Sequence, residues 1–258
     1  MNKVSYKEWA KSASKEIGFK EVYYLMKALL NDGYDENEII KPLIAESLNM
    51  ALKKRQQNIP LSKIIQKKWF MENVFLTNET TLDPRPETEF LFEKINNKPR
   101  SVLELGVGTG CVILSILKKY IKCKGVGIDI CEKAILVAKK NACYLKLNKK
   151  VKFLKNNWAF GVKGEFDLIV SNPPYVDKNL NLDPCVKHDP EIALFGCVET
   201  YKEIFKSLSE VKFKQMLLEV PDYLKNYVKN ELKIFFPDYS VNEFNVYNSN
   251  IYFLDVFL

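Results

Sequence analysis

Apolar residues along this chain follow two different spacings, which divide it into two parts. Over the first eighty residues they recur at the spacing of helices. A capping-box pattern at 5–8 predicts the first helix start, and further helices are expected at about 20–30 and 35–57. Asn31-Asp32-Gly33 is expected to end the second of these. A looser alternation from Trp69 to Thr77 predicts a hairpin between the helical region and the rest.

From about residue 101 the pattern changes to short apolar runs separated by helical stretches. The strand-like runs lie at 101–105, 125–130, 151–154, 166–171 and 215–220. Helical stretches near 110–121, 131–146, 198–210 and 221–235 separate most of them. This alternation predicts an α/β fold with a doubly wound, mostly parallel sheet. Two further runs, 240–247 and 251–258, predict a C-terminal hairpin that adds an antiparallel strand at or near the sheet edge.

Composition narrows the class of protein. Of the 258 residues, 47% are hydrophobic and 28% are charged, which is ordinary for a soluble globular protein. No apolar run is long enough to span a membrane, and the N-terminus lacks the apolar core of a signal peptide, so a cytoplasmic protein is expected. The six cysteines form no C-x-x-C pair and there is one histidine, so no metal site is expected and the thiols are interpreted as reduced.

The net charge of +7 is unevenly distributed. The segment 118–155 carries twelve lysines against only Asp129 and Glu132. This density suits an acidic partner such as nucleic acid. It also suits lysines that solvate the outer faces of helices, and that interpretation fits a chain rich in Lys and Asn better.

The tetrapeptide Asn172-Pro173-Pro174-Tyr175 is the clearest candidate for chemistry. It follows the strand-like run 166–171, and ligands bind at strand ends in open α/β sheets. Asn172 precedes a proline, which disfavours helical backbone there. The prolines have no N–H, so their peptide groups only accept hydrogen bonds, and Asn172 adds a side-chain carbonyl. With the flat ring of Tyr175, these groups suit a planar ligand that carries an NH₂ group, such as an amide or a base.

A glycine-rich turn forms the second candidate site. Residues 102–110 read as a strand that runs into Gly106-Val107-Gly108-Thr109-Gly110 and then a helix. The spacing is G-x-G-x-G and not the dinucleotide fingerprint. Asp129 ends the next strand, where a carboxylate can accept from ribose hydroxyls or cap the following helix.

Taken in order, these motifs resemble those of class I S-adenosylmethionine-dependent methyltransferases, and more narrowly the HemK-type release factor glutamine methyltransferases. Segment 83–89 resembles that family's signature between its helical and catalytic domains, and segment 189–196 resembles a later family segment. Trp158 matches a tryptophan that the family uses beside the cofactor, although a core tryptophan is the alternative. Asn157, where the family often has Asp, and the tail around 247–250 depart from the pattern.

The resemblance implies a seven-stranded class I sheet preceded by a small helical domain. The expected boundaries are 1–67 for a helical substrate-recognition domain, 68–82 for a linking hairpin and 83–258 for the catalytic domain. The cofactor-binding residues implied are Glu104, Gly106, Val107, Gly108, Thr109, Gly110, Asp129, Trp158 and Asn172. The catalytic and substrate-binding residues implied are Asn172, Pro173, Pro174 and Tyr175. Arg85 and Glu87 are expected either to shape the substrate cleft or to form an ion pair that anchors the interdomain segment.

The activity implied is methyl transfer from S-adenosylmethionine to the glutamine side-chain amide in the Gly-Gly-Gln motif of a class 1 peptide chain release factor. The alternative is an RNA or DNA amino-methyltransferase that acts on adenine N6 or guanine N2, since such enzymes carry the same type of tetrapeptide. A third hypothesis is a cofactor-binding module without activity. The 83–89 signature and the N-terminal helical region favour the protein substrate.

Overall fold

The computed structural model describes residues 4–30, 33–247 and 249–258, which form two compact units. One unit comprises Met1–Lys67 together with Leu182–His188, and the other comprises Lys68–Asn181 and Asp189–Leu258. The first is the helical unit and the second is the sheet unit. The expected boundaries assign 182–188 to the catalytic domain, whereas the structure groups this segment, with its short helix η2 (Val186–His188), with the helices.

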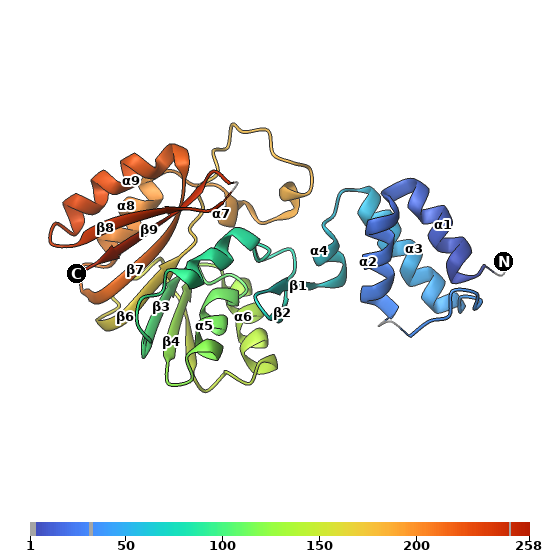
Figure 1. Ribbon diagram of the computed structural model, residues 1–258, viewed down its shortest axis with the longest axis horizontal. Coiled ribbons are helices and arrows are strands. Elements are labelled where there is room, and N and C mark those ends of the chain that lie inside the picture. Colours follow the sequence, from blue (N-terminus) through green and yellow to red (C-terminus); the bar gives the residue numbers. More distant parts are fainter. Residues whose placement is uncertain (1–3, 31–32, 248) are drawn as a thin grey trace. The chain divides into compact units, whose positions relative to one another are not determined.

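The helical unit contains α1 (Tyr6–Ile17), α2 (Phe19–Leu30), α3 (Pro42–Gln56) and α4 (Leu61–Ile65), all labelled in Figure 1. Its core is built from buried side chains that include Trp9, Leu25 and Leu48. The predicted capping box is confirmed, because the Glu8 backbone N–H donates to the Ser5 hydroxyl and the Glu8 carboxylate accepts from the Ser5 backbone N–H. Asn31 and Asp32, expected to end α2, lie outside the described residues.

Helix α3 begins at Pro42, several residues after the predicted start near Asp35. The intervening backbone bonds instead to the start of α1: Tyr6 N–H donates to Glu38 O, and Ile40 N–H donates to Val4 O. Proline suits the first helical position and disfavours helical backbone in the residue before it. The helix therefore cannot extend back past Pro42.

The sheet unit is built on a seven-stranded sheet of order β5-β4-β3-β6-β7-β9-β8. The strands are β3 (Ser101–Leu105), β4 (Lys124–Asp129), β5 (Val151–Lys155), β6 (Gly164–Ser171), β7 (Val211–Pro221), β8 (Ser240–Asn245) and β9 (Ile251–Phe257). Strands β3 to β7 pair in parallel, and β9 runs antiparallel between β7 and β8. The predicted doubly wound sheet with a C-terminal hairpin is confirmed. Strands β1 (Lys67–Phe70) and β2 (Asn73–Leu76) form a separate two-stranded sheet.

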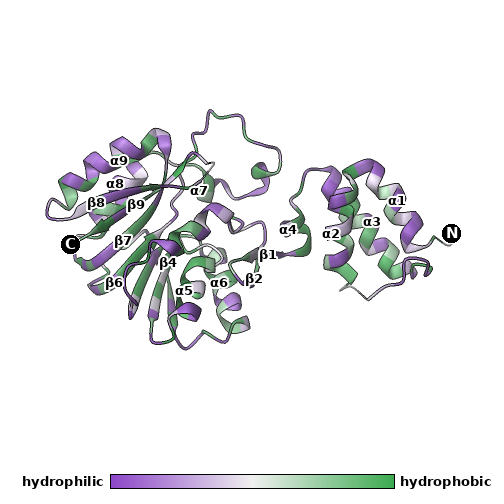
Figure 2. Cartoon of the chain, in the orientation of Figure 1, coloured by the Kyte–Doolittle hydropathy of each residue, from purple (hydrophilic) through white to green (hydrophobic). Residues whose placement is uncertain are grey.

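Helices cover both faces of the large sheet (Figure 1). Helices α5 (Cys111–Lys119) and α6 (Glu132–Tyr144), with the 3-10 segment η1 (Pro86–Glu93), pack on one face. Helices α8 (Val198–Ser207) and α9 (Asp222–Phe235) pack on the other. The central strands are mostly hydrophobic, whereas α9 carries many hydrophilic residues (Figure 2). Within the described residues, no helix is long and apolar enough to cross a membrane.

The chain order creates a switch point in the middle of the sheet. From β3 the chain moves outward through β4 and β5, then returns to β6 on the other side of β3 and continues to β7. Successive connections therefore leave the carboxyl ends of β3 and β6 in opposite directions. A crevice opens at such a point, and ligands bind there in open α/β sheets.

Candidate functional site

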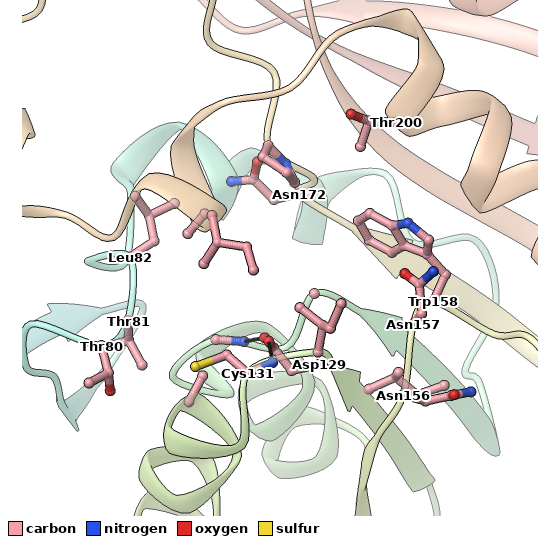
Figure 3. A pocket seen from close by; sticks show the side chains of 18 of the residues that line it. Thr80, Thr81, Leu82, Asp129, Cys131, Asn156, Asn157, Trp158, Asn172 and Thr200 are labelled. Atoms are coloured by element: carbon pink, nitrogen blue, oxygen red, sulfur yellow. Dashed lines mark hydrogen bonds between the residues drawn. The ribbon is translucent and has the colours of Figure 1, made fainter. Parts of the chain in front are cut away.

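A pocket of about 280 Å³ lies at the carboxyl ends of β3, β4 and β6, within the sheet unit. Figure 3 shows Asp129 and Cys131 beneath it, Trp158 on one side, Thr80 to Leu82 on the opposite side and Asn172 above. Three separate predictions, the glycine turn, the second-strand acid and the tetrapeptide, therefore meet at one place. The lining residues are Thr80, Thr81, Leu82, Gly106, Gly108, Ile128, Asp129, Ile130, Cys131, Ala134, Asn156, Asn157, Trp158, Asn172, Pro174, Ile192, Ala193, Phe195, Thr200 and Glu203.

The glycine turn gives a ligand close access to the backbone. Gly106 has φ +75° and Gly108 has φ +50°, conformations that favour glycine. A Cβ added at Gly106 would lie 3.8 Å from the Trp158 ring and 4.0 Å from the Asn172 carbonyl oxygen, so it would fill the space between them. Around a Cβ at Gly108 there is open space. This cradle fits a ligand held against the backbone, as the implied cofactor would be.

Asp129 fixes the turn from the end of β4. Its Oδ2 accepts from Gly108 N–H at 2.8 Å, and its Oδ1 accepts from Cys131 N–H at 2.8 Å. Burial raises the pKa of the Asp129 carboxyl, and these backbone hydrogen bonds oppose the rise. An ionised carboxylate has about four acceptor positions, and the backbone groups do not occupy all of them. The N-cap residue of α6 is Cys131, without a side-chain cap, so the capping alternative for Asp129 is wrong and its ribose-binding role stays a prediction.

Trp158 supplies a flat wall of the pocket. Its backbone has φ +46°, which is uncommon for a residue other than glycine. The half-buried indole packs against the core beneath α8, and its Nε1–H donates to Glu203 Oε2 at 3.3 Å. Trp158 is thus both a partial core residue and a lining residue, and its left-handed backbone is the kind of strain found at binding sites.

The Asn172 tetrapeptide is held from behind by a buried network. Asn172 Nδ2 donates to the Thr88 hydroxyl at 3.0 Å, and this hydroxyl donates to Glu219 Oε2 at 2.6 Å. The Tyr175 hydroxyl donates to Glu219 Oε1 at 3.0 Å. Glu219 is 1% exposed, and burial raises the pKa of its carboxyl to about 7. Asn172 and Pro174 line the pocket, whereas Pro173 is buried.

The segment that follows the tetrapeptide is anchored by an ion pair. Arg85 Nη2 lies 2.6 Å from Asp189 Oδ2, and the Asp189 side chain is 3% exposed. The partner of Arg85 is thus Asp189, and not Glu87 as the predicted ion pair would have it. Glu87 lies near enough to Glu219 to raise the pKa of that carboxyl.

Several predicted residues lie beneath the pocket lining. Glu104 is buried and accepts from Ile113 N–H at 3.0 Å, and its burial raises its pKa well above the ordinary value. Val107 and Thr109 are also buried, and Gly110 contacts α5 and α6 side chains. These residues shape the turn from inside the fold.

Other residues of the site carry no motif that sequence reasoning recognised. Thr88 lies inside the 83–89 segment, and the family resemblance implies no role for it. Glu219 lies in the predicted apolar strand 215–220, which carries no site motif. Thr80 and Thr81 precede that segment, and Glu203 lies on α8. A carboxylate inside the buried run 215–220 was the available signal for Glu219, because an acid is rarely placed there without partners.

The chain is similar in sequence to a family of methyltransferases. A family model described as methyltransferase small domain matches residues 71–188. The release factor glutamine methyltransferase of Buchnera aphidicola subsp. Baizongia pistaciae is 37% identical over 210 residues, which cover 78% of this chain and 75% of that protein. The protein of the same name from Dictyoglomus turgidum is 32% identical over 217 residues, covering 78% and 77%. That from Caulobacter vibrioides is 38% identical over 159 residues, covering 58% of this chain and 55% of that protein.

Solved structures support the fold. The catalytic domain of hMettl16 in complex with the MAT2A 3'UTR hairpin 1 superposes with a TM-score of 0.57 at 14% identity, covering 91% of this chain and 90% of that one. A methyltransferase from Pyrococcus furiosus superposes with a TM-score of 0.53 at 19% identity, covering 71% and 87%. At these identities the likeness concerns the fold alone. Two of the sequence relatives go further, because the match covers about three quarters of the Buchnera and Dictyoglomus proteins at 37% and 32% identity, and on that evidence this chain belongs to the release factor glutamine methyltransferase family.

Proposed function

We propose that this protein transfers a methyl group from S-adenosylmethionine to the side-chain amide nitrogen of the glutamine in the Gly-Gly-Gln motif of a class 1 peptide chain release factor. The observation that carries the proposal is the Asn172 amide at the pocket edge, with its NH₂ group held by Thr88. This leaves Oδ1 as an acceptor for an N–H group of the substrate. Family membership supports the same substrate.

The pocket supplies groups that suit the cofactor. Asp129 would accept from the ribose hydroxyls, and the backbone at Gly106 and Gly108 would lie against the methionine part. Trp158 would lie beside the adenine. The other predicted cofactor-binding residues would act indirectly, by holding the glycine turn in shape. They are Gly110 and the buried residues Glu104, Val107 and Thr109. When bound, S-adenosylmethionine supplies a methyl group on a positively charged sulfur.

The main difficulty of this reaction is the nucleophile, because the lone pair of an amide nitrogen is delocalised into its carbonyl. Two acceptors on its N–H bonds, Asn172 Oδ1 and the Pro173 carbonyl, would orient the nitrogen and favour its pyramidal form. They would also stabilise the positive charge that develops on nitrogen in the transition state. Orientation alone is worth effective molarities of roughly 10⁵ to 10⁸ M. No base is needed before transfer, and the product proton can leave to water.

Tyr175 would contribute a rigid ring beside the substrate amide. Its hydroxyl donates to Glu219, and its backbone carbonyl accepts from the Tyr223 hydroxyl, so the residue is fixed at both ends. Arg85 would contribute to substrate binding indirectly, by holding Asp189 and the segment after the tetrapeptide. Glu87 stays a candidate for the substrate cleft.

The helical unit is proposed to recognise the release factor, as the resemblance implies for the N-terminal domain. A cytoplasmic location is proposed with it, because release factors act in translation. Most of the twelve lysines in 118–155 are exposed and solvate the surface of α5, α6 and the adjoining loops, so nucleic acid is assigned no direct role.

The proposal is tested by transfer of radiolabelled methyl from S-adenosylmethionine to purified release factor. A release factor with Gln→Ala in its Gly-Gly-Gln motif and total tRNA and rRNA serve as parallel substrates. Label on the wild-type factor that disappears with the Gln→Ala factor is the expected result. Label on RNA and none on the factor would move the assignment to an RNA amino-methyltransferase. Absence of turnover on every substrate would support a cofactor-binding module.

Replacing Asn172 tests the proposed mechanism directly. We expect Asn172→Ala to lower kcat by about 100-fold or more, because one preorganised group that stabilises transition-state charge is worth that much. Cofactor affinity, measured by calorimetry, should change little, because Asp129 and the glycine turn stay intact. Unchanged turnover in this variant would contradict the mechanism.

A further inference from the structure

A buried carboxylate lies directly behind the Asn172 tetrapeptide. Glu219 is in β7, the strand that pairs with β6, with Leu218 opposite Ser171. Its two oxygens accept from the Thr88 and Tyr175 hydroxyls, at 2.6 and 3.0 Å. Its backbone carbonyl accepts from the Tyr201 hydroxyl at 2.9 Å. Taking an ionised acid out of water is costly, so a position at 1% exposure calls for an explanation beyond packing.

The direction of the hydrogen bonds in this network is fixed by the number of available protons. The Thr88 hydroxyl has a single hydrogen, and an ionised carboxylate can only accept. Thr88 therefore donates to Glu219, and its oxygen can only accept from Asn172. The NH₂ group of the Asn172 amide must then face Thr88, at 3.0 Å, and its Oδ1 must turn away from Thr88.

We propose that Glu219 is a positioning residue that acts through Thr88 to determine which end of the Asn172 amide is presented to the substrate. The inference rests on the proposed function, since the orientation matters only when Asn172 must accept a hydrogen bond from a substrate N–H. Neither Glu219 nor Thr88 needs to touch the substrate.

Protonation of Glu219 removes this control. A protonated carboxyl can donate to Thr88, and the Thr88 hydroxyl can then donate to Oδ1 of a rotated Asn172 amide. The rotated amide presents NH₂ to a substrate NH₂, and two donors do not pair. The orientation is therefore held when Glu219 is ionised and is lost as the pH falls through its pKa.

The groups around Glu219 set the pH range of this change. Its pKa is raised to about 7, chiefly by burial and also by Glu87, while the Thr88 and Tyr175 hydroxyls and Arg85 oppose the rise. Tyr201 is buried, and its own pKa is raised well above the ordinary value, so it stays neutral here. The activity that depends on the Asn172 orientation should therefore be lost from about pH 7 downward.

The first experiment measures kcat against pH with the release factor substrate. In the wild type, kcat should fall about tenfold for each pH unit below the Glu219 pKa. Glu219→Gln keeps an oxygen that can accept from Thr88 but does not titrate, so its profile should be flat between pH 6 and 8. An acidic limb in Glu219→Gln like that of the wild type would overturn the proposal.

Thr88 variants separate positioning from packing. Thr88→Val keeps the side-chain shape without the hydroxyl, and we expect kcat at pH 8 to fall by about 100-fold, as for other misplaced reacting groups. The KM for S-adenosylmethionine should change less than about twofold, because the hydroxyl is outside the cofactor cradle. Thr88→Ser restores the hydroxyl and should recover kcat. Wild-type kcat in Thr88→Val would overturn the proposal.

Asp255→Asn is the matched control. Asp255 is a second buried acid of the same sheet, at 3% exposure, and its side chain accepts from Gln215 and Asn96. Removing the charge of Asp255 tests whether the loss of any buried carboxylate changes the dependence of kcat on pH. The acidic limb should persist in Asp255→Asn, and its disappearance would contradict the assignment to Glu219.

A readout without substrate distinguishes failure of this inference from failure of the proposed function. The side-chain NH₂ signals of Asn172, identified by their loss in Asn172→Ala, are followed by NMR from pH 6 to 8. They should titrate near pH 7 in the wild type and not in Glu219→Gln. Titrating signals without methylation of the release factor would refute the proposed function alone. Methylation with signals that do not titrate would refute the role of Glu219 alone.

Discussion

Asp129 both holds the glycine turn and lines the pocket. Its carboxylate already holds the Gly108 and Cys131 backbone N–H groups, which gives the glycine turn its shape. Loss of this side chain should therefore alter the cradle and remove a ligand contact together.

We expect Asp129→Ala to raise the cofactor Kd by roughly 10- to 100-fold, which corresponds to about 1.4 to 2.8 kcal/mol. Isothermal titration calorimetry with S-adenosylmethionine measures this. Asp167 provides a control, because its Oδ2 also accepts from two backbone N–H groups, those of Arg100 and Ser101, away from the pocket. Asp167→Ala should lower stability and leave Kd unchanged. An unaltered Kd in Asp129→Ala would exclude the ribose-binding role.

Glu219 should also make stability depend on pH. Its pKa is about 7 in the folded protein against an ordinary value of 4.5. A raised pKa means that the favourable contribution of the protonated group is complete below about pH 4.5 and is lost as the pH rises through 7. At about 1.4 kcal/mol for each pKa unit, the difference is about 3 kcal/mol. Relative to the wild type, the free energy of unfolding of Glu219→Gln should therefore rise by about 3 kcal/mol between pH 4.5 and 8.

Urea unfolding at both pH values measures this difference. If the free energy of unfolding depended on pH in the same way in both proteins, the pKa of Glu219 would not be raised in the folded protein. The same ionisation that orients Asn172 lowers stability, so the stability and activity of the wild type should move in opposite directions across this pH range.

At the scale of elements, the sequence identifies buried strands better than half-buried ones. The predicted run 101–105 coincides with β3, whose residues are mostly buried. Strand β7 begins at Val211, four residues before the predicted 215, because Lys212 and Lys214 alternate with buried residues there. Such alternation is typical of a strand with one solvated face, whereas an apolar run marks only the part buried on both faces.

The candidate site was predictable to the extent that its residues stand next to one another in the chain. The glycine turn, Asp129 and the tetrapeptide are local patterns. The Thr88–Glu219 hydrogen bond joins residues 131 positions apart, and Asn172 and Thr88 are 84 positions apart. These contacts depend on the order and register of the strands, which the spacing of apolar residues does not specify.

Gly196 shows how closely two loops of the site approach each other. The segment before it pairs with the residue that follows the tetrapeptide, since Val176 N–H donates to Leu194 O at 2.8 Å. A Cβ added at Gly196 would lie 1.9 Å from the Pro174 carbonyl oxygen. The backbone of one loop would have to move, and Pro174 lines the pocket.

We expect Gly196→Ala to lower the free energy of unfolding by about 1 to 3 kcal/mol, as overpacking does. Displacement of the tetrapeptide should also lower kcat by about 100-fold. Steady-state kinetics and urea unfolding measure the two effects. Wild-type kinetics in this variant would mean that the loops separate without disturbing Asn172.

At the scale of the whole molecule, the helical unit is held together partly by a segment that lies far along the chain. Arg55 in α3 donates from Nε to Glu21 Oε2 in α2 at 2.7 Å, and from Nη1 to Cys185 Sγ at 3.7 Å. His188 Nε2 lies 3.2 Å from Gln57 O. Arg55 thus joins two helices and the 182–188 segment.

We expect Arg55→Ala to lower the stability of the helical unit by about 1.5 to 3 kcal/mol, the value of a hydrogen bond to a charged group. Hydrogen exchange should show lower protection in α2 and α3 and unchanged protection in β3 and β6. Lys53→Ala, at an exposed position of the same helix, is the control and should have little effect. Equal loss of protection in the sheet would contradict separate stabilisation of the two units.

The discontinuity of the helical unit has a consequence for its synthesis. Arg55 and Cys185 are 130 residues apart, so the segment that completes this unit leaves the ribosome only after β3, β4, β5 and β6. Domains usually fold in the order in which they are made. Here the helical unit is not complete until four strands of the other unit have been translated. Until residue 188 emerges, α1 to α4 must persist as a partly stabilised bundle, and a chaperone or protease would meet them in that state.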